Sequence, residues 1–277
     1  MPELPEVETI VRELRPRLVG RTVTRPRLHA TDVLRGVSRG RLLATLRTNR
    51  IVEVTRRAKH VVLRLASGHR VVIQPRMTGS LIVYGRRLRP DERRYIVLEA
   101  SLGGQRVLVF RDVRRLGTVW LLDEAGWRSY TARIGPEPLA ADFDLARFAA
   151  CLRGTRQAIK KVLMDQRRIA GVGNIYANEA LYRARVDPSL PADQLSPRAR
   201  RRLHAAVLSV LREAVAHRGT TLRDYRTGTG ERGEHQAALA VYGRGGEPCL
   251  RCGTRLTATH AIDGRATTFC YRCQGRT

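Results

Sequence analysis

The sequence predicts an α+β protein of three parts: an opening helix with antiparallel β-strands, a helical middle, and a short β-hairpin near the end. Three observations support this prediction. Apolar residues recur at helical spacing over residues 1–19, and β-branched runs separated by glycine turns fill residues 21–122. Four of the five cysteines are paired near the end of the chain, where they would organise the hairpin.

The first element is a helix over residues 1–19. Pro5 suits a first turn, where its missing N–H is not needed, and Glu3 and Glu6 lie near the positive end of the helix dipole. Gly20 is a plausible end to this helix. Its apolar face comprises Val7, Ile10, Val11, Leu14 and Leu18.

The second element is a set of antiparallel strands, expected to form a β-sandwich. Alternating or β-branched runs such as "RIVEVTRR" and "KHVVLRLASGHRVVIQP" are separated by glycine-containing turns such as "ASGH" and "SLGGQ". The β pattern ends at a boundary near residues 131–142, within "RIGPEPLAADFD".

The third element is a group of helices, in which Asp142 and Ser196 are expected as N-caps and Pro197 follows at a first helical position. After the last helix, residues 219–235 are polar and glycine-rich, which indicates a mobile loop. The helices are expected at residues 142–152, 155–166, 174–184 and 196–217.

The cysteines at the end of the chain have the spacing of a zinc ribbon. Cys249 and Cys252 form one C-x2-C pair, and Cys270 and Cys273 form the second. Four protein ligands leave no open coordination position, so a structural Zn²⁺ is expected. The fifth cysteine, Cys151, lies in an apolar stretch and is expected to be a buried core thiol.

The charge of the chain points to nucleic acid. Its 277 residues include 52 Lys+Arg and 25 Asp+Glu, a formal net charge of +27. A solvated arginine-rich surface that reflects coding bias is the alternative. Only Lys59, Lys160 and Lys161 are lysines, so each is a candidate for a role that the broad guanidinium of arginine cannot fill.

No targeting segment or membrane span is expected. The first ten residues are acidic, unlike the basic-then-apolar start of a signal peptide, and no apolar run approaches the ~18 residues of a membrane helix. We therefore expect a soluble, cytoplasmic protein.

Two sites in the second half of the chain could bind phosphate. Gly171 and Gly173 precede Asn174 at an expected helix start, where bare backbone N–H groups can bind an anion. Arg265 would lie at the tip of the hairpin, within reach of a phosphate. An ordinary turn and a solvated arginine are the alternatives.

The run "GTGERG" matches the dinucleotide-binding pattern through Gly228, Gly230 and Gly233. That pattern requires a strand before it and a helix after it. Here the run lies in the polar loop after a helix, so a dinucleotide site is not expected.

Pro2 is a candidate nucleophile. Removal of Met1 would expose a secondary amine whose pKa lies well below that of lysine, so more of it is a free base at neutral pH. Such an amine can attack carbon to give an iminium, and Glu3 beside it could transfer protons. A start residue without a catalytic role is the alternative.

Several motifs, taken together and in order, give the chain a family resemblance that covers nearly its whole length. These motifs are "MPELPEVET", "RRAKH", "MTGSL", "DVRRLG", "IGPEPL", "GVGNIYANEAL", "VYGRGGEPCLRCG" and "GRATTFCYRCQ". Through them, the chain resembles the formamidopyrimidine-DNA glycosylase family.

The resemblance implies a bifunctional DNA glycosylase and AP lyase of base-excision repair. Such an enzyme removes oxidised purines, 8-oxoguanine and formamidopyrimidines, from duplex DNA and then nicks the strand by β,δ-elimination. Pro2 would form the Schiff base with C1′ of the sugar, and Glu3 would assist ring opening as the acid. Glu6 would be a supporting carboxylate, and Lys59 would bind phosphate beside the lesion.

The resemblance also implies residues that hold DNA. Asn174 and Arg265 would bind backbone phosphates, Arg265 as part of the catalytic set, and Lys160 would touch the backbone as well. The target nucleotide must leave the duplex, and side chains that fill the gap offset that cost. Met77, Arg114 and Leu116 match the void-filling positions, and Gln74 matches a phosphate-binding position.

The implied fold has an N-terminal β-sandwich domain with the opening helix (1–134), a helix–two-turns–helix domain (135–240), and a zinc-finger hairpin (241–277). Within the second domain, the loop at about 219–235 would close over the flipped base. The expected partner is double-stranded DNA that contains oxidised bases. The protein is expected to act as a monomer in the bacterial cytoplasm, associated with the nucleoid.

Three positions depart from the family pattern. Leu116 stands where phenylalanine is usual, Gln74 where histidine is usual, and His235 lies in a capping loop that usually carries an aromatic residue. These departures bear on the preferred lesion more than on the chemistry.

Two other functions are weighed against this one. A sister enzyme of the endonuclease VIII type would prefer oxidised pyrimidines, but "PELPEVE" and the void-filling triad disfavour it. A catalytically inactive zinc-finger DNA-binding paralogue is disfavoured by intact Pro2, Glu3 and Lys59.

The phosphate-binding residues predict that DNA affinity depends strongly on salt. Each neutralised phosphate releases counterions, so the logarithm of the binding constant should fall with the logarithm of salt concentration by ~0.9 per phosphate contact. Fluorescence anisotropy of a labelled duplex across a salt series measures the slope. A slope near zero would contradict these assignments.

Overall fold

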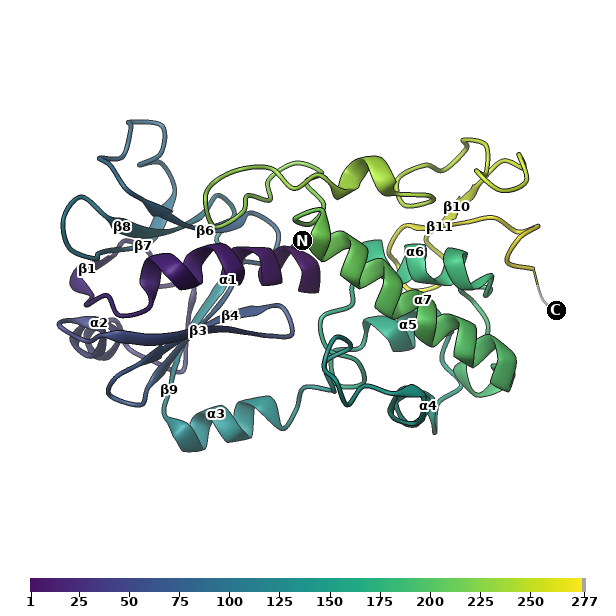
Figure 1. Ribbon diagram of the computed structural model, residues 1–277, viewed down its shortest axis with the longest axis horizontal. Coiled ribbons are helices and arrows are strands. Elements are labelled where there is room, and N and C mark those ends of the chain that lie inside the picture. Colours follow the sequence, from purple (N-terminus) through teal and green to yellow (C-terminus); the bar gives the residue numbers. More distant parts are fainter. Residues whose placement is uncertain (276–277) are drawn as a thin grey trace. The chain divides into compact units, whose positions relative to one another are not determined.

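The computed structural model describes residues 1–275, which form two compact units (Figure 1). Unit 1 comprises Met1–Ala132 and His217–Gln236. Unit 2 comprises Arg133–Ala216 and the segment that begins at Ala237. The chain therefore leaves unit 1 once and returns to it for twenty residues after the last long helix. The three-part division at residues 134/135 and 240/241 stays a prediction.

Unit 1 is a sandwich of two β-sheets with helix α1 (Leu4–Leu18) packed against strands of both. The first sheet has the strand order β1-β7-β8-β6 and is antiparallel throughout. The second has the order β2-β9-β5-β4-β3. The strands are β1 (Thr24–Leu28), β2 (Leu34–Arg35), β3 (Ile51–Arg57), β4 (His60–Leu65), β5 (Arg70–Gln74), β6 (Gly79–Tyr84), β7 (Ile96–Ser101), β8 (Val107–Asp112) and β9 (Thr118–Leu122).

The predicted opening helix is confirmed. Its apolar face is fully buried in the core of unit 1, together with inward-facing residues of both sheets such as Leu63 and Phe110. Gly20 follows the helix with a left-handed φ of 82°, which a glycine adopts without the steric cost of a Cβ. The helix is thus positioned by hydrophobic burial along its length, which fixes where its first residues lie.

Parts of unit 1 differ from the expectation of strands alone over residues 21–122. Helix α2 (Arg39–Leu46) lies in this range because the Ser38 hydroxyl accepts the Arg41 N–H at 3.2 Å and caps it. Helix α3 (Glu124–Thr131) follows β9. Strand β2 pairs parallel with β9, which a hairpin could not do but two segments distant in the sequence can.

The helices of unit 2 confirm the predicted helical middle. The Ser196 cap is confirmed, since its hydroxyl accepts the Ala199 N–H at 3.2 Å. The Asp142 cap is wrong: Asp144 caps α4 by accepting the Arg147 N–H at 2.7 Å, and Asp142 instead forms an ion pair with the Arg147 guanidinium. The elements are α4 (Leu145–Leu152), α5 (Ile159–Met164), α6 (Asn174–Ala184), the 3-10 turn η1 (Ala192–Gln194) and α7 (Pro197–Ala216).

The last part of unit 2 is the predicted β-hairpin. Strands β10 (Thr257–Thr259) and β11 (Thr267–Phe269) pair antiparallel, and β11 packs against α6. A short 3-10 turn, η2 (His235–Ala238), precedes this segment. Cys151 is half-buried in α4 rather than fully buried.

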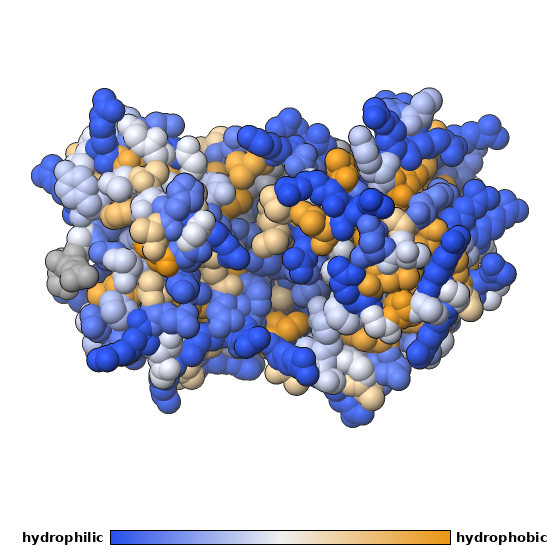
Figure 2. All heavy atoms as spheres, turned by 180° about the vertical axis from the view of Figure 1, so that it is seen from behind, coloured by the Kyte–Doolittle hydropathy of each residue, from blue (hydrophilic) through white to orange (hydrophobic). Residues whose placement is uncertain are grey.

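The visible face of the molecule is dominated by hydrophilic side chains, with smaller apolar areas between them (Figure 2). The hydrophilic surface agrees with the excess of arginine in the sequence. Among residues 1–275, no helix is both long and apolar enough to cross a membrane.

Candidate functional site

The first residues of the chain are buried at the start of α1. Glu3 is the N-cap of the helix, and its backbone N–H donates to the Glu6 carboxylate at 2.7 Å. Pro2, Glu3 and Glu6 are all buried. The carboxylates predicted as catalytic and supporting residues are therefore held by the helix start itself, with Glu6 fixing the backbone of Glu3.

Lys59 lies in the tight turn between β3 and β4, and only 5% of its surface is exposed. The turn contains a left-handed residue, Ala58, at φ 50°. Its backbone is held by Arg56, whose guanidinium donates to the Ala58 carbonyl at 3.0 Å and to the Glu8 carboxylate at 2.9 Å. Arg56 thus connects this turn to helix α1.

The ion pair between Glu8 and Arg56 also shows the direction of α1 along β3. Farther along the helix, the Arg15 guanidinium donates to the Val54 carbonyl at 3.0 Å. The N-terminal end of α1 therefore runs toward the Lys59 turn.

Burial opposes ionisation of Glu8, but hydrogen bonds from the Arg12 and Arg56 guanidiniums outweigh it, so the Glu8 pKa is lowered.

Met77, Arg114 and Leu116 lie on two adjacent loops and protrude from unit 1. Met77 is 46% exposed and Leu116 is 39% exposed, which is unusual for large apolar side chains. The Arg114 guanidinium contacts the Met77 sulfur at 3.7 Å. Arg76 and Arg115, which flank these residues, both have left-handed backbones at φ 52°.

Asp112, which the sequence analysis did not single out, orders both of these loops. Its buried carboxylate accepts the Gly117 N–H at 2.7 Å and the Arg114 N–H at 3.3 Å. It also accepts the Thr78 hydroxyl, one residue after Met77. Asp112 is the first residue of the "DVRRLG" motif, so the sequence marked this position. The role of its carboxylate, however, depends on contacts that form only when the chain folds.

Strand register places these features at one end of the sandwich. Val61 pairs with Ile73, which puts the Lys59 turn beside the end of β5, where Gln74 lies. Gln74 in turn pairs with Thr118, directly after the Leu116 loop. The five sequence-predicted residues of the β-strand region are therefore gathered at the end of unit 1 toward which the start of α1 points: Lys59, Gln74, Met77, Arg114 and Leu116.

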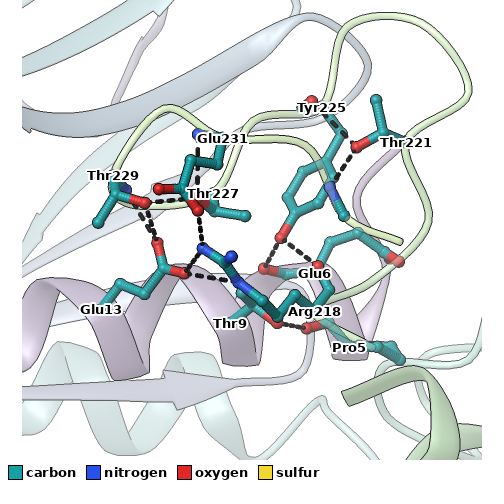
Figure 3. Close-up of polar contacts among 11 residues, drawn as sticks. Pro5, Glu6, Thr9, Glu13, Arg218, Thr221, Tyr225, Thr227, Thr229 and Glu231 are labelled. Atoms are coloured by element: carbon teal, nitrogen blue, oxygen red, sulfur yellow. Dashed lines mark hydrogen bonds and ion pairs between the residues drawn. The ribbon is translucent and has the colours of Figure 1, made fainter. Parts of the chain in front are cut away.

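The predicted mobile loop at residues 219–235 lies within the segment His217–Gln236, which packs against α1 in unit 1 (Figure 3). Thr221, Tyr225 and Thr227 are buried, and Tyr225 belongs to the core of the unit. The Tyr225 hydroxyl donates to the Glu6 carbonyl at 3.1 Å, and the Thr220 N–H donates to the Glu6 carboxylate at 2.7 Å. Polar groups of the loop therefore bond to α1.

His235 lies at the base of this loop and is buried. Its Nδ1 lies 3.1 Å from Nδ1 of His217, so the two rings meet where the loop begins and ends. His235 therefore forms part of the closure of this loop.

In unit 2, Lys160, Asn174 and Arg265 come together around the hairpin turn. Lys160 is 0% exposed, and its Nζ donates to the Thr267 hydroxyl at 2.7 Å and to the Asp263 carboxylate at 3.2 Å. The same Asp263 oxygen accepts the Arg265 N–H at 3.1 Å. The Asn174 side-chain amide donates to the carbonyl of Ala266, the residue after Arg265, at 3.0 Å.

The four predicted zinc ligands are also brought together in unit 2. All four sulfur atoms lie within 4.8 Å of one another. Two of their separations are 3.9 Å (Cys249 to Cys273) and 3.5 Å (Cys252 to Cys270). Sulfurs at ~2.3 Å from a tetrahedral Zn²⁺ would be ~3.8 Å apart, so the cluster fits the ion.

Helix α6 supports both the hairpin and the cysteines. Its buried Glu179 carboxylate accepts the N–H groups of Ala240, Val241 and Tyr242 at 2.8–2.9 Å. One turn later, the Tyr182 hydroxyl lies 3.3 Å from the Cys249 sulfur. Neither residue has a role predicted from the sequence, although Glu179 belongs to the "GVGNIYANEAL" motif and Tyr182 directly follows it.

Three family descriptions match the chain in the order of these elements. The N-terminal domain of formamidopyrimidine-DNA glycosylase matches residues 1–119, and the H2TH domain of the same enzyme matches residues 134–226. The zinc finger found in this glycosylase and in isoleucyl-tRNA synthetase matches residues 246–275. Together these matches define a DNA glycosylase fold with an H2TH domain and one structural zinc.

Whole-chain relatives specify the family. The chain is 42% identical to the formamidopyrimidine-DNA glycosylase of Chloroflexus aurantiacus, over 99% of this chain and 98% of that protein. It is 43% identical to that of Thermomicrobium roseum, over 99% of each. The chain belongs to the formamidopyrimidine-DNA glycosylase family.

Solved structures agree with this assignment. The MutM (Fpg) protein of Thermus thermophilus superposes with a TM-score of 0.87 at 38% identity, over 100% of both chains. The Lactococcus lactis Fpg in complex with DNA that contains an abasic site superposes with a TM-score of 0.90 at 32% identity, over 99% of this chain and 100% of that chain.

The contacts of Asp112 predict that an Asp112→Ala variant loosens the loops carrying Met77, Arg114 and Leu116. Removing the carboxylate leaves the Gly117 N–H without its acceptor, which should lower the free energy of unfolding by ~1–3 kcal/mol. Urea denaturation measures this, and hydrogen exchange should accelerate at Gly117 and Arg114. The exposed Asp91→Ala change is the control and should leave both measurements near wild type.

The zinc cluster predicts a local response to chelation. Removing the ion should unfold the hairpin and weaken DNA binding, because the thiolates no longer hold its two ends, while unit 1 keeps its β-sheets. Circular dichroism, hydrogen exchange and a DNA-binding titration with and without chelator measure these effects. Collapse of the β-sheet signal together with the hairpin would contradict the prediction.

Proposed function

We propose that the protein is a bifunctional DNA glycosylase and AP lyase that removes oxidised purines from duplex DNA in base-excision repair. The observation that carries the proposal is the Pro2–Glu3 pair at the start of α1, fixed by Glu6, in a chain that belongs to this family along its whole length. The substrates are 8-oxoguanine and formamidopyrimidine lesions.

The reaction begins after removal of Met1. The free amine of Pro2 attacks C1′ of the damaged nucleotide, a new N–C1′ bond forms, and the glycosidic bond breaks. The base leaves with the electron pair of that bond and takes up a proton, and the Pro2 nitrogen, now bonded to C1′, loses its own proton. Glu3 is the acid that protonates the sugar ring oxygen as the ring opens, and this step gives the Schiff base.

The Schiff base makes the sugar prone to elimination. The iminium withdraws electrons, so a proton is lost from C2′ and the 3′ phosphate departs in β-elimination. Loss of the 5′ phosphate by δ-elimination follows, and hydrolysis of the iminium returns the amine of Pro2. Burial of Pro2 and Glu3 limits the access of bulk water to the intermediate.

DNA is held through its phosphates in both units. Lys59 and Gln74 bind phosphate at the end of unit 1 that carries the start of α1, while Asn174 and Arg265 bind phosphate in unit 2. Lys160 contributes by a different route, because its buried ammonium contacts the hairpin turn. Through Asp263 it holds the backbone of Arg265 for phosphate binding.

Met77, Arg114 and Leu116 occupy the space left by the flipped nucleotide. Extrusion of a base costs a few kcal/mol, and wedge residues inserted into the stack offset that cost. Their exposed position, with Arg114 against Met77, suits insertion into DNA. Arg114 hydrogen-bonds the orphaned base opposite the lesion.

We also propose that the protein acts as a monomer associated with the bacterial nucleoid. Each predicted catalytic and DNA-binding residue comes from the one chain, and a net charge of +27 favours retention on DNA.

Borohydride trapping tests the covalent chemistry. Reduction of the Schiff base should give a protein–DNA adduct on a duplex that carries 8-oxoguanine, and the adduct should be lost in a Pro2→Gly variant or in protein that retains Met1. Denaturing gel electrophoresis and mass spectrometry of the N-terminus measure both. A Pro16→Ala variant, which changes a proline at the other end of α1, should trap normally.

The outcomes of this experiment separate the candidate functions. Failure of the wild type to trap on any lesion would indicate a DNA-binding protein without catalysis. Preferred trapping on thymine glycol would indicate an enzyme for oxidised pyrimidines.

A further inference from the structure

Glu13 of α1 makes a set of contacts that neither the catalytic chemistry nor DNA binding uses. Its carboxylate accepts the Thr229 N–H at 2.9 Å and the Thr229 hydroxyl at 3.0 Å (Figure 3). It also accepts the Arg218 guanidinium at 2.7 and 3.2 Å. One carboxylate thus binds two points of the segment His217–Gln236, eleven positions apart in the sequence.

Glu13 and Glu6 act as two anchors on one face of α1. They are seven residues apart, so both side chains project from the same side of the helix. Glu6 binds the Thr220 N–H at 2.7 Å, near the start of the segment, and Glu13 binds Thr229 near its middle. The segment is closed on itself by antiparallel pairing of Thr220 with Glu234.

Two glycines of "GTGERG" allow close approaches of the backbone. A Cβ on Gly228 would lie 2.9 Å from the Ile10 carbonyl and 3.1 Å from the Glu13 side chain. A Cβ on Gly233 would lie 2.2 Å from the Gly219 carbonyl, inside the segment itself. Gly228 therefore lets the segment pack against α1, and Gly233 lets the segment close on itself.

The seated segment lies beside the catalytic residues. The Glu6 carboxylate that accepts the Thr220 N–H also accepts the Glu3 N–H. On the other side, the Val83 N–H of β6 donates to the Gly228 carbonyl at 3.4 Å. The segment is held at two points of α1, Glu6 and Glu13. These contacts therefore determine where the segment lies relative to Pro2 and Glu3.

We propose that Glu13 is a positioning residue for the base-excision step, acting by holding the segment His217–Gln236 where it contacts the base of the damaged nucleotide. The proposal rests on the proposed glycosylase function. Hydrogen bonds from Arg218, Thr227 and Thr229 outweigh the effect of burial and lower the Glu13 pKa, so the anchor is ionised at neutral pH. A segment fixed before the substrate arrives loses less entropy when it binds the base.

The abasic site provides the discriminating substrate, because it has a sugar for Pro2 but no base for the segment to contact. A Glu13→Gln variant keeps the size of the side chain but loses the ion pair with Arg218. Because the amide has only one acceptor oxygen, its NH2 group must face either the Arg218 guanidinium or the Thr229 N–H, which are both donors. Single-turnover excision of 8-oxoguanine should fall by about tenfold or more, since small misplacements near a reacting centre can cost ~100-fold. Nicking of a preformed abasic site should stay within about twofold of wild type.

A second variant tests the seat without altering charge. Gly228→Ala introduces a methyl group against the Ile10 carbonyl and should show the same split between the two substrates. If Glu13→Gln fails to fold, the comparison between excision and abasic-site nicking is made with Gly228→Ala. Glu53→Gln is the matched control, since Glu53 pairs with Arg64 at 2.8 Å elsewhere in unit 1, and it should leave both activities unchanged.

Each outcome decides the proposal. Equal loss of excision and abasic nicking in folded variants would mean that Glu13 supports the enzyme generally, and the proposal would be overturned. Wild-type rates on both substrates would overturn it as well. Wild-type protein that nicks abasic DNA but excises no oxidised purine would instead refute the proposed function, independently of Glu13.

Discussion

The arrangement of the chain around the start of α1 depends on one buried carboxylate. Glu6 accepts two backbone N–H groups, that of Glu3 three residues before it and that of Thr220 more than two hundred residues after it. A buried carboxylate is costly without hydrogen-bond partners, and these two N–H donors offset part of that cost. The start of α1 and the segment His217–Gln236, to which the chain returns after α7, therefore share one anchor.

In unit 2, helix α6 likewise binds a distant segment of the chain through its polar side chains. Polar residues on α6 bind the backbone or sulfur of the C-terminal segment at successive turns, through Asn174, Asn178, Glu179 and Tyr182. The hairpin is too small to bury a core of its own, so the cysteine cluster and these bonds supply its order. Arg265 at the tip of the hairpin therefore projects from a fixed backbone, although the two strands are short.

The sequence predicted the elements whose cause is local. Helical spacing located α1, alternating or β-branched runs located strands such as β3, β4 and β5, and the C-x2-C spacing identified the cysteine cluster. Where the prediction was wrong, local alternatives were nearly equal: Asp142 and Asp144 are both plausible caps, and the fold uses the second. Helix α2 was missed because a short helix between strands leaves little periodic signal, and its Ser38 cap is recognisable only with hindsight.

By itself, the sequence determined the residue types of the predicted site: a proline next to a glutamate at the start, a lysine in an arginine-rich chain, and four paired cysteines. The family resemblance added Met77, Arg114 and Leu116. Tertiary structure alone decided which of these meet and what holds them. Asp112, Glu13 and Glu179 are acidic residues like any others in the sequence, and their partners lie in distant segments or depend on loop conformation. The physical reason is that a buried carboxylate is specified by the donors that surround it, and those donors converge only when the chain has folded.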